Sequence, residues 1–162
     1  MKGTISGCLS ALGLLAIFGL IGGGLAFWGW NILQDARASA SWPTADGIVS
    51  SSEVDHSTDA EGGDSYSPEV DYQYVIDGQN HINNTIKFGE NSYSSRRRAE
   101  EITASYPVGR QVTVYYDPEQ PDKSVLEPGV TAGSYIVLGI GVLFIVIALI
   151  VAPLTFIFRR RS

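Results

Sequence analysis

The sequence predicts a membrane protein in which two transmembrane helices flank a small β-rich domain, a membrane α plus small β fold. Its two long apolar runs, residues 8–30 and 135–158, contain no charged residue. Each exceeds the roughly 20 helical residues that cross the ~30 Å hydrocarbon core of a bilayer. We expect an N-terminal transmembrane anchor at 1–34, a β-rich domain at 41–128, and a C-terminal transmembrane helix with a basic tail at 133–159.

The first apolar run is expected to be a retained anchor. The tripeptides at 36–38 and 38–40, Ala-Arg-Ala and Ala-Ser-Ala, have the small-x-small form of a signal-peptide cleavage site. The run is, however, longer than the ~7–15-residue core of a signal peptide, and the polar segment 31–39 places these alanines well beyond its end. A cleaved signal peptide followed by a single C-terminal anchor is the alternative.

The distribution of charge predicts how the chain lies in a membrane. All 17 acidic residues fall between Asp35 and Glu127, where seven basic residues leave a formal charge of −10. The other basic residues, Lys2 and the arginine triplet 159–161, lie outside the two runs. Short basic flanks stay cytoplasmic, whereas long loops cross regardless of their charge. We therefore expect a multi-pass protein of the cell membrane with both termini cytoplasmic and the middle domain extracytoplasmic.

Glycines in both runs indicate how the helices pack. Gly19 and Gly23 form a small-xxx-small pair, reinforced by Gly22 and Gly24, and this spacing lets two helix backbones approach closely in lipid. The second run carries Gly133, Gly139 and Gly141, so one interpretation is that the two helices pack on each other. The other interpretation, that glycine is simply common in membrane helices, carries equal weight.

Other residues of the runs bear on their role. Trp28, Trp30 and Tyr135 are placed as interfacial anchors at the outer ends of the helices. Neither run contains Asp, Glu, Lys, Arg or His, the groups that ion and proton pathways use inside membranes. A two-helix transporter or channel is therefore not expected.

The middle domain carries the period-two pattern of strands. Residues 47–54 are expected to form a first strand, and residues 55–67, rich in Asp, Ser and Gly, an exposed loop. In the clearest strand, Val70, Tyr72, Tyr74 and Ile76 alternate with Glu69, Asp71, Gln73 and Val75.

A hairpin follows this strand. Asp77-Gly78 favours a tight primed turn, because both residues tolerate positive φ. The return strand at 79–86 is expected to place Ile82 and Ile86 on a common face.

The remaining elements are a short helix at 96–105 capped by Ser95, a strand at 111–116 and an edge strand at 124–126. Five short strands and one helix predict a curled antiparallel sheet or small open β-barrel. Its expected core consists of Tyr72, Tyr74, Ile76, Val112 and Val114.

An ordered series of short motifs resembles a known family. The series comprises Trp42-Pro43, Gly47 and Val49, the Tyr72–Tyr74 strand with Asp77-Gly78, Tyr106-Pro107-Val108-Gly109, Val114-Tyr115-Tyr116-Asp117-Pro118, and Leu126. It is similar to the bacterial membrane family catalogued as domain of unknown function 3592, over the whole middle domain. The resemblance implies a β domain held at a bacterial membrane, and it brings no activity, ligand or catalytic residue.

The residues of the domain do not indicate an enzyme. His56 falls in the acidic loop, and His81 is placed opposite the Val70 face or near the turn. No nucleophile turn and no phosphate-binding glycine loop accompany them. We therefore expect no catalytic residue and no cofactor, because catalysis requires a positioned acid, base or nucleophile.

Residues 55–64 are rich in side chains that can bind a metal ion, but their spacing does not match a known metal-binding loop. The group consists of Asp55, His56, Asp59, Glu61 and Asp64. Hard cations prefer such oxygen-rich groups, but the alternating ligands, central glycine and closing glutamate of a calcium loop are missing. The stretch is therefore interpreted as a solvated loop with no metal site.

One cationic cluster, Arg96-Arg97-Arg98, lies within the domain. Pairing with Glu100 and Glu101 is favoured over contact with anionic lipid headgroups. The domain's charge of −10 and its expected location argue against nucleic-acid binding.

Two functions from different classes remain. In the first, the domain is a non-enzymatic binding module that docks a partner membrane protein through its sheet edge and a tyrosine-bearing face. Its expected contact residues are Tyr93, Tyr106 and Tyr115, because tyrosine is enriched in protein interfaces. In the second, the protein is a structural, self-associating membrane subunit assembled by its glycine-lined helices. The partners expected are the lipid bilayer and either another membrane protein or further copies of the chain.

Overall fold

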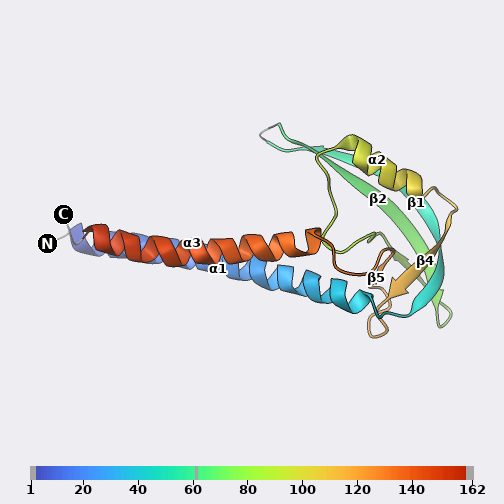
Figure 1. Cartoon of the computed structure of the whole chain (residues 1–162), viewed down its shortest axis with the longest axis horizontal. Helices are drawn as coiled ribbons and strands as arrows, with labels where there is room; N and C mark the ends of the chain where they lie inside the picture. Colours follow the sequence, from blue (N-terminus) through green and yellow to red (C-terminus); the bar gives the residue numbers. More distant parts are fainter. Residues whose placement is uncertain (1–2, 61, 160–162) are drawn as a thin grey trace. The chain divides into compact units, whose positions relative to one another are not determined.

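The computed structural model of the chain describes residues 3–60 and 62–159, in two compact units (Figure 1). One unit is the domain from Leu33 to Gly133, and the other is the helix pair formed by the residues up to Ile32 and from Ser134 on. Along the chain the elements are α1 (Gly3–Ser39), β1 (Thr44–Thr58), β2 (Asp64–Ile76), β3 (Gln79–Asn83), α2 (Arg96–Ser105), β4 (Gln111–Tyr116), β5 (Ser124–Val125) and α3 (Gly133–Arg159).

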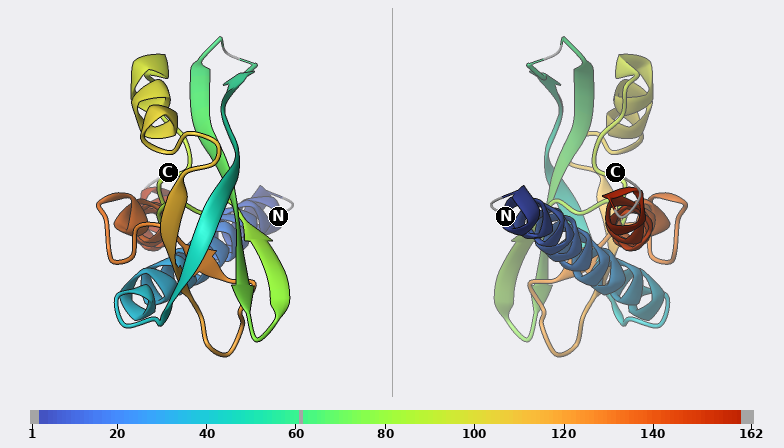
Figure 2. Two further views of the ribbon diagram at one scale, coloured as in Figure 1. Left: turned by 90° about the vertical axis from the view of Figure 1, so that its right-hand side faces the viewer. Right: turned by 90° about the vertical axis from the view of Figure 1, so that its left-hand side faces the viewer.

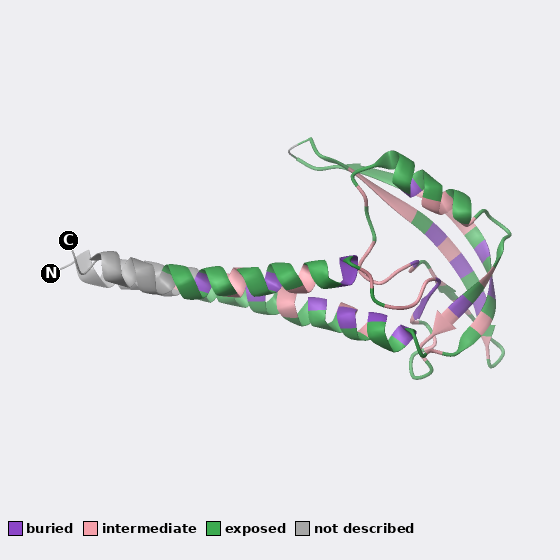
Figure 3. Cartoon of the chain, viewed as in Figure 1, coloured by how far each residue is buried: buried purple, intermediate pink, exposed green. Residues whose placement is uncertain are grey.

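Both long helices contain a segment that is long and apolar enough to cross a membrane. Within the described part of the chain these segments are Ala16–Ser39 in α1 and Gly133–Val151 in α3. Their apolar side chains are largely uncovered, as Leu20 (78 % exposed) and Phe27 (70 % exposed) illustrate. Figure 3 shows exposed positions along most of the described length of both helices.

The two helices pack through glycines, but not through the predicted pair. A Cβ added at Gly29 would lie 2.3 Å from the backbone nitrogen of Leu138, and one at Gly141 would lie 2.3 Å from that of Ala26. At Gly19 and Gly23 the added atom would meet nothing within 4 Å. Of the glycines expected to pack, Gly22 and Gly141 lie in the contact, whereas the pair Gly19 and Gly23 does not. The backbones meet instead on the face of α1 that carries Gly22, Ala26 and Gly29, at the four- and three-residue spacing of one helix side.

The domain is built on an open, five-stranded antiparallel sheet of order β3-β2-β1-β4-β5 (Figure 2). This confirms the predicted small antiparallel sheet. Beyond its two edges, the amides of Leu126 and Glu127 donate to the carbonyls of Thr85 and Ile86, at 3.2 and 2.8 Å. These two bonds join the segments that follow β5 and β3, so that the sheet curls around its core.

The core lies on one face of this sheet. Tyr72, Tyr74 and Val114 are buried, as predicted, while Ile76 and Val112 are partly buried and pack against them. Figure 3 shows the alternation of buried and exposed positions along the strands. The remaining buried members are Val49, Val70, Ile86 and Leu126.

The predicted loop at 55–67 is wrong over most of its length. β1 runs on to Thr58 and β2 begins at Asp64, so that the two strands form a long ribbon. Beyond the last paired residues, the Asp59 carboxylate accepts a 2.7 Å hydrogen bond from the Gly63 amide. The polar composition suggested a loop, but a two-stranded ribbon exposes both of its faces and needs no apolar residues to pair its backbone groups.

The hairpin turn after β2 is confirmed, whereas its return strand is shorter than predicted. Asp77 and Gly78 have φ values of 52° and 80°, as a primed turn requires. β3 ends at Asn83, whose Oδ1 accepts hydrogen bonds from the amides of Asn84 and Thr85. This side-chain turn interrupts the alternation, so that Ile86 is buried while Ile82 is 64 % exposed.

The helix and the following strand were predicted correctly. α2 spans Arg96–Ser105 and packs with Ala99 buried, and β4 spans Gln111–Tyr116. Ser95 occupies the N-cap position, but its side chain makes no capping hydrogen bond. Ser52 of β1 donates to the carbonyl of Thr103 at 3.2 Å, which fixes α2 beside the ribbon.

Candidate functional site

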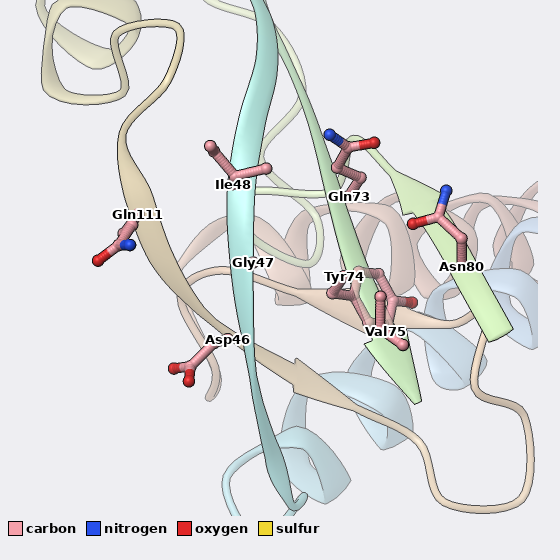
Figure 4. A pocket seen from close by; sticks show the side chains of 8 residues that line it. All are labelled: Asp46, Gly47, Ile48, Gln73, Tyr74, Val75, Asn80 and Gln111. Atoms are coloured by element: carbon pink, nitrogen blue, oxygen red, sulfur yellow. The ribbon is translucent and has the colours of Figure 1, made fainter. Parts of the chain in front are cut away.

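The outer face of the sheet, opposite the core, carries a shallow groove of about 480 Å³ (Figure 4). Its centre is a row across four strands, in which Ile48 of β1 lies between Gln111 of β4 and Gln73 of β2. Gln73 in turn lies opposite Ile82 of β3. The groove is lined by Asp46, Gly47, Ile48, Gln73, Tyr74, Val75, Asn80 and Gln111.

Apolar side chains are exposed on this face without cover from the domain. Ile48, Val75 and Ile82 are 39 %, 59 % and 64 % exposed. They surround Gln73, two of them across the neighbouring strands and Val75 two residues further along β2. Most surface apolar residues need no explanation when they are scattered singly, but a contiguous group marks a candidate interaction site.

The polar side chains that line the groove are mostly amides. Gln73, Asn80 and Gln111 present amide groups, each of which both donates and accepts hydrogen bonds. Asp46 is the one carboxyl side chain among the groove's lining residues. The groove thus offers apolar contact with adaptable hydrogen bonding, which suits binding and supplies no acid–base pair.

Gly47, the fourth residue of β1, lies where the sheet leaves no room for a side chain. An added Cβ there would lie 2.6 Å from Cγ2 of the buried Val114 and 3.1 Å from the carbonyl oxygen of Gln73. A side chain at this position would therefore displace the core below the groove. Glycine in a strand interior often marks such a close approach.

The tyrosines do not form the exposed binding face that the sequence suggested. Tyr72 and Tyr74 are core residues, and burial raises the pKa of both hydroxyls. Tyr106 donates a 2.9 Å hydrogen bond to Glu127, and burial together with this carboxylate raises its pKa to about 12. Tyr93 lies under the Arg98 guanidinium, 5.1 Å from the ring centroid. Tyr115 points to the outer side of β4 but is half-buried.

The buried tyrosine hydroxyls hold the connections of the sheet in place. Tyr74 donates to the carbonyl of Pro121 at 2.5 Å, and Tyr72 donates to that of Thr85 at 3.0 Å. The Tyr72 hydroxyl also lies 3.1 Å from the Ser124 hydroxyl. These bonds attach the β4–β5 connection, β5 and the segment after β3 to β2.

His81 lies on the core face, so the first of its two predicted placements, opposite the Val70 face, was wrong, whereas the second, near the turn, agrees with its position as the third residue of β3. It pairs with Tyr74 across β2 and β3, and the two rings stack with centroids 5.4 Å apart. Its Nδ1 is 2.6 Å from the Asp122 carboxylate, while Asn83 donates to the Asp122 carbonyl at 2.7 Å. The histidine therefore ties β3 to the β4–β5 connection.

The acidic stretch of the ribbon is held by local contacts. The Asp64 carboxylate lies 3.0 Å from both His56 Nε2 and the Thr58 hydroxyl, and these hydrogen bonds lower its pKa. His56 also stacks on Tyr66, with ring centroids 4.7 Å apart. Glu61 lies outside the described residues. Among those described, no three His, Cys, Asp or Glu side chains are grouped in a way that would hold a metal ion.

The arginine cluster of α2 is paired within the domain, as the preferred interpretation expected. Arg96 and Arg97 reach Glu100 and Glu101 at 2.8 and 3.5 Å, one turn along the helix. Pairs at this spacing are stabilising by only a few tenths of a kcal/mol. With Arg98 over Tyr93, all three guanidinium groups have a partner in the domain.

The part of the chain that forms the sheet and its groove matches a known sequence family. The family model described as Domain of unknown function (DUF3592) matches residues 45–131, more than half of the chain. The chain belongs to this family. The DUF3592 match extends from the second residue of β1 past β5, so it includes the core and every residue that lines the groove. No curated protein matches the chain.

Sequence reasoning found part of this site. Val75 was placed opposite the tyrosine face of its strand, and its apolar character at a position otherwise occupied by Glu69, Asp71 and Gln73 was the available signal. Ile82 was expected to share a face with Ile86, but it is exposed while Ile86 is buried. Recognition of the patch required the register that aligns Ile48, Gln73 and Ile82 across three strands.

Proposed function

We propose that this DUF3592 protein is a two-span integral membrane protein that displays its β domain outside the cytoplasm as a non-enzymatic interaction module. The observation that carries the proposal is the combination of two uncovered apolar helices with a domain whose outer sheet face exposes Ile48, Val75 and Ile82. The exposed apolar side chains of the helices are suited to contact with lipid. Those of the sheet face are suited to contact with a protein surface. The module requires no catalytic residue, metal ion or cofactor.

The end of α1 supports a retained first span. Leu33 and Ala36 are buried and belong to the domain unit. Asp35 pairs with Lys123 at 2.5 Å, and the Ser39 hydroxyl accepts a 2.9 Å hydrogen bond from the Gly129 amide. Cleavage after Ala38 would remove Leu33, Asp35 and Ala36 from the folded domain, and cleavage after Ala40 would remove Ser39 as well. These contacts therefore favour the retained anchor over the cleaved-signal alternative.

The proposed topology predicts the behaviour of inserted reporters. Lys2 and the 159–161 arginines favour cytoplasmic termini. A reporter fused after Ser162 is expected to be active only in a form that works in the cytoplasm. A reporter inserted at Gly63, in the exposed turn of the ribbon, is expected to be active only in a form that works outside. Cytoplasmic activity at Gly63 would overturn the topology.

The second candidate is a structural subunit that self-associates through its helices. Gly19 and Gly23 favour this candidate, because α3 does not cover them. A Cβ added at either position would meet nothing within 4 Å. Small residues on an open helix side allow a second backbone to approach in lipid.

Purification in mild detergent distinguishes the two candidates. The interaction module predicts that a variant with Gly19→Leu and Gly23→Leu recovers the same associated chains as the unaltered protein, because these positions touch no other part of the described chain. The structural alternative predicts that this variant loses its associated copies. Loss in the glycine variant, with the domain still protease-resistant, would contradict the module.

A further inference from the structure

We propose that the outer face of the sheet binds an extended, basic segment of another protein. The apolar residues of that segment lie in the groove, and its lysines or arginines lie over the β1–β2 ribbon. This inference rests on the proposed function, because it specifies the partner of the same interaction module. It is carried by the way apolar and acidic side chains are distributed along the face, and by the shape of the face.

The strand register divides the outer face into an apolar part and an acidic part. The apolar part contains the groove and the exposed side chains of Ile48, Val75 and Ile82. On β2, the residues two and four positions before Gln73 point to the same side as Gln73 and are both acidic. Their partners on β1 continue the pattern. The acidic part consists of Glu53 and Asp55 on β1 and of Glu69 and Asp71 on β2, and Asp46 adds a fifth carboxylate at the groove.

The described part of the chain supplies no cation to this face. The outward positions of β1, β2, β3 and β4 hold no lysine or arginine. The ion pairs of the described residues all use carboxylates elsewhere in the chain. The arginines of α2 lie on the other side of the sheet, where Ala99 is buried and Ile102 packs against the core. The face therefore attracts a basic partner and repels an acidic one, including a second copy of itself.

The carboxylates of the acidic part also repel one another. Glu53 and Glu69 lie directly opposite each other across β1 and β2. Asp71 is the diagonal neighbour of Glu53, and Asp55 is the diagonal neighbour of Glu69. Like charges at opposed cross-strand positions destabilise a sheet. A lysine or arginine placed over them offsets this repulsion while it forms ion pairs, so the same contact stabilises both the complex and the ribbon.

The shape of the face favours an extended segment over a folded surface. The groove is hollowed into the sheet around β1 and β2, and these two strands run on directly into the ribbon (Figure 4). From Glu69 to Val75, β2 spans roughly 20 Å, the length of about seven extended residues. An extended chain turns alternate side chains to one side, so these meet the groove first and the carboxylates next. The amides of Gln73, Asn80 and Gln111 supply donors and acceptors for its backbone.

An array of synthetic peptides, probed with the full chain in mild detergent, tests the partner's chemistry. Each peptide has seven residues, with threonine at the even positions. The odd positions carry isoleucine, lysine, glutamate or serine in every combination. Peptides with two isoleucines followed or preceded by two lysines are expected to retain the most protein. Replacement of both lysines by glutamate should reduce binding at least about fivefold, and added salt should weaken binding because it screens exposed charges.

Two double variants with the same change in charge locate the site. Glu53→Gln with Glu69→Gln is expected to weaken binding of the best peptide about fivefold. The melting temperature of this variant should stay unchanged or rise, because the repulsion between the two carboxylates is lost. Glu101→Gln with Glu119→Gln changes exposed residues outside the face, and binding should change less than about twofold. Ile82→Thr should weaken binding of the same peptide about threefold, because Ile82 is 64 % exposed and available for contact.

The outcomes separate this inference from the proposed function. Equal binding of lysine and glutamate peptides, equal loss in the two double variants, or no bound peptide would each overturn the basic segment. Displacement of the best peptide by spermine at the same ammonium concentration would also overturn it, because a site for cations alone needs no apolar part. Preferred binding of uncharged peptides would overturn the basic partner but leave the interaction module. Extraction of membranes at alkaline pH is scored separately, and release of the chain would overturn the membrane anchoring.

Discussion

Tyr74→Ala is expected to make the domain unstable and sensitive to protease. Tyr74 is 2 % exposed, stacks on His81, and donates the hydrogen bond to Pro121 that holds the β4–β5 connection. Truncation of a buried aromatic side chain costs ~3–5 kcal/mol, which is a large share of the ~5–15 kcal/mol that stabilises a typical domain. Limited proteolysis and thermal melting of the full chain in detergent would measure the loss.

The neighbouring residue provides the control for this prediction. Gln73→Ala removes an exposed side chain on the opposite face of the same strand, and its effect is expected to stay within ~0.5 kcal/mol. Tyr74→Phe keeps the ring and removes only the hydroxyl, so it should lie between the two, with a loss of about 1 kcal/mol. Equal protease sensitivity in Tyr74→Ala and Gln73→Ala would show that the core is not on the tyrosine face.

Gly141→Leu is expected to separate α1 from α3. A Cβ at Gly141 would lie 2.3 Å from the nitrogen of Ala26 and 2.9 Å from the carbonyl oxygen of Gly22, and backbone atoms cannot give way as flexible side chains do. Such overpacking typically costs ~1–3 kcal/mol. Phe18 and Phe144 stack with centroids 5.7 Å apart, so in a Cys8→Ser background cysteines at these two positions, joined by a short bis-maleimide, report on the pairing. The yield of this intrachain cross-link should fall about tenfold.

A second glycine on the same helix serves as the comparison. Gly139→Leu adds a side chain where nothing lies within 4 Å, so the cross-link should form as readily as in the parent that carries the same two cysteines. If Gly139→Leu reduced the cross-link as much as Gly141→Leu, the α1–α3 contact would have to lie on a different side of α3.

Local patterns were enough for the elements whose signals agree with one another. The helix at 96–105 is followed by Tyr106-Pro107, which ends it, and the strand at 111–116 alternates over its full length, so the bounds of both were predicted correctly. Asp77-Gly78 specified its turn because only a few residues tolerate positive φ at two successive positions. The membership in DUF3592 followed from an ordered set of such motifs.

Elements with conflicting signals were misjudged. The ribbon at 55–67 has a loop-like composition, yet its strands pair because Asp64 bonds His56 and Thr58, and His56 stacks on Tyr66 across the strands. The end of β3 was set by one side chain, Asn83, whose bonds to the following amides shift the phase of the chain. Neither effect is visible in hydrophobic periodicity.

The sequence by itself determined the two apolar helices, the alternating strands between them and the tyrosine core, because length, hydrophobicity and period are properties of a segment alone. Only the tertiary structure decided which glycines meet and which apolar residues remain uncovered. Gly22, Gly29 and Gly141 differ from Gly19 and Gly23 only in the direction they face, and that direction is set by how the two helices rotate against each other. Ile48, Val75 and Ile82 form one patch only through the register of three strands, since pairing brings residues that are distant in sequence to adjacent positions.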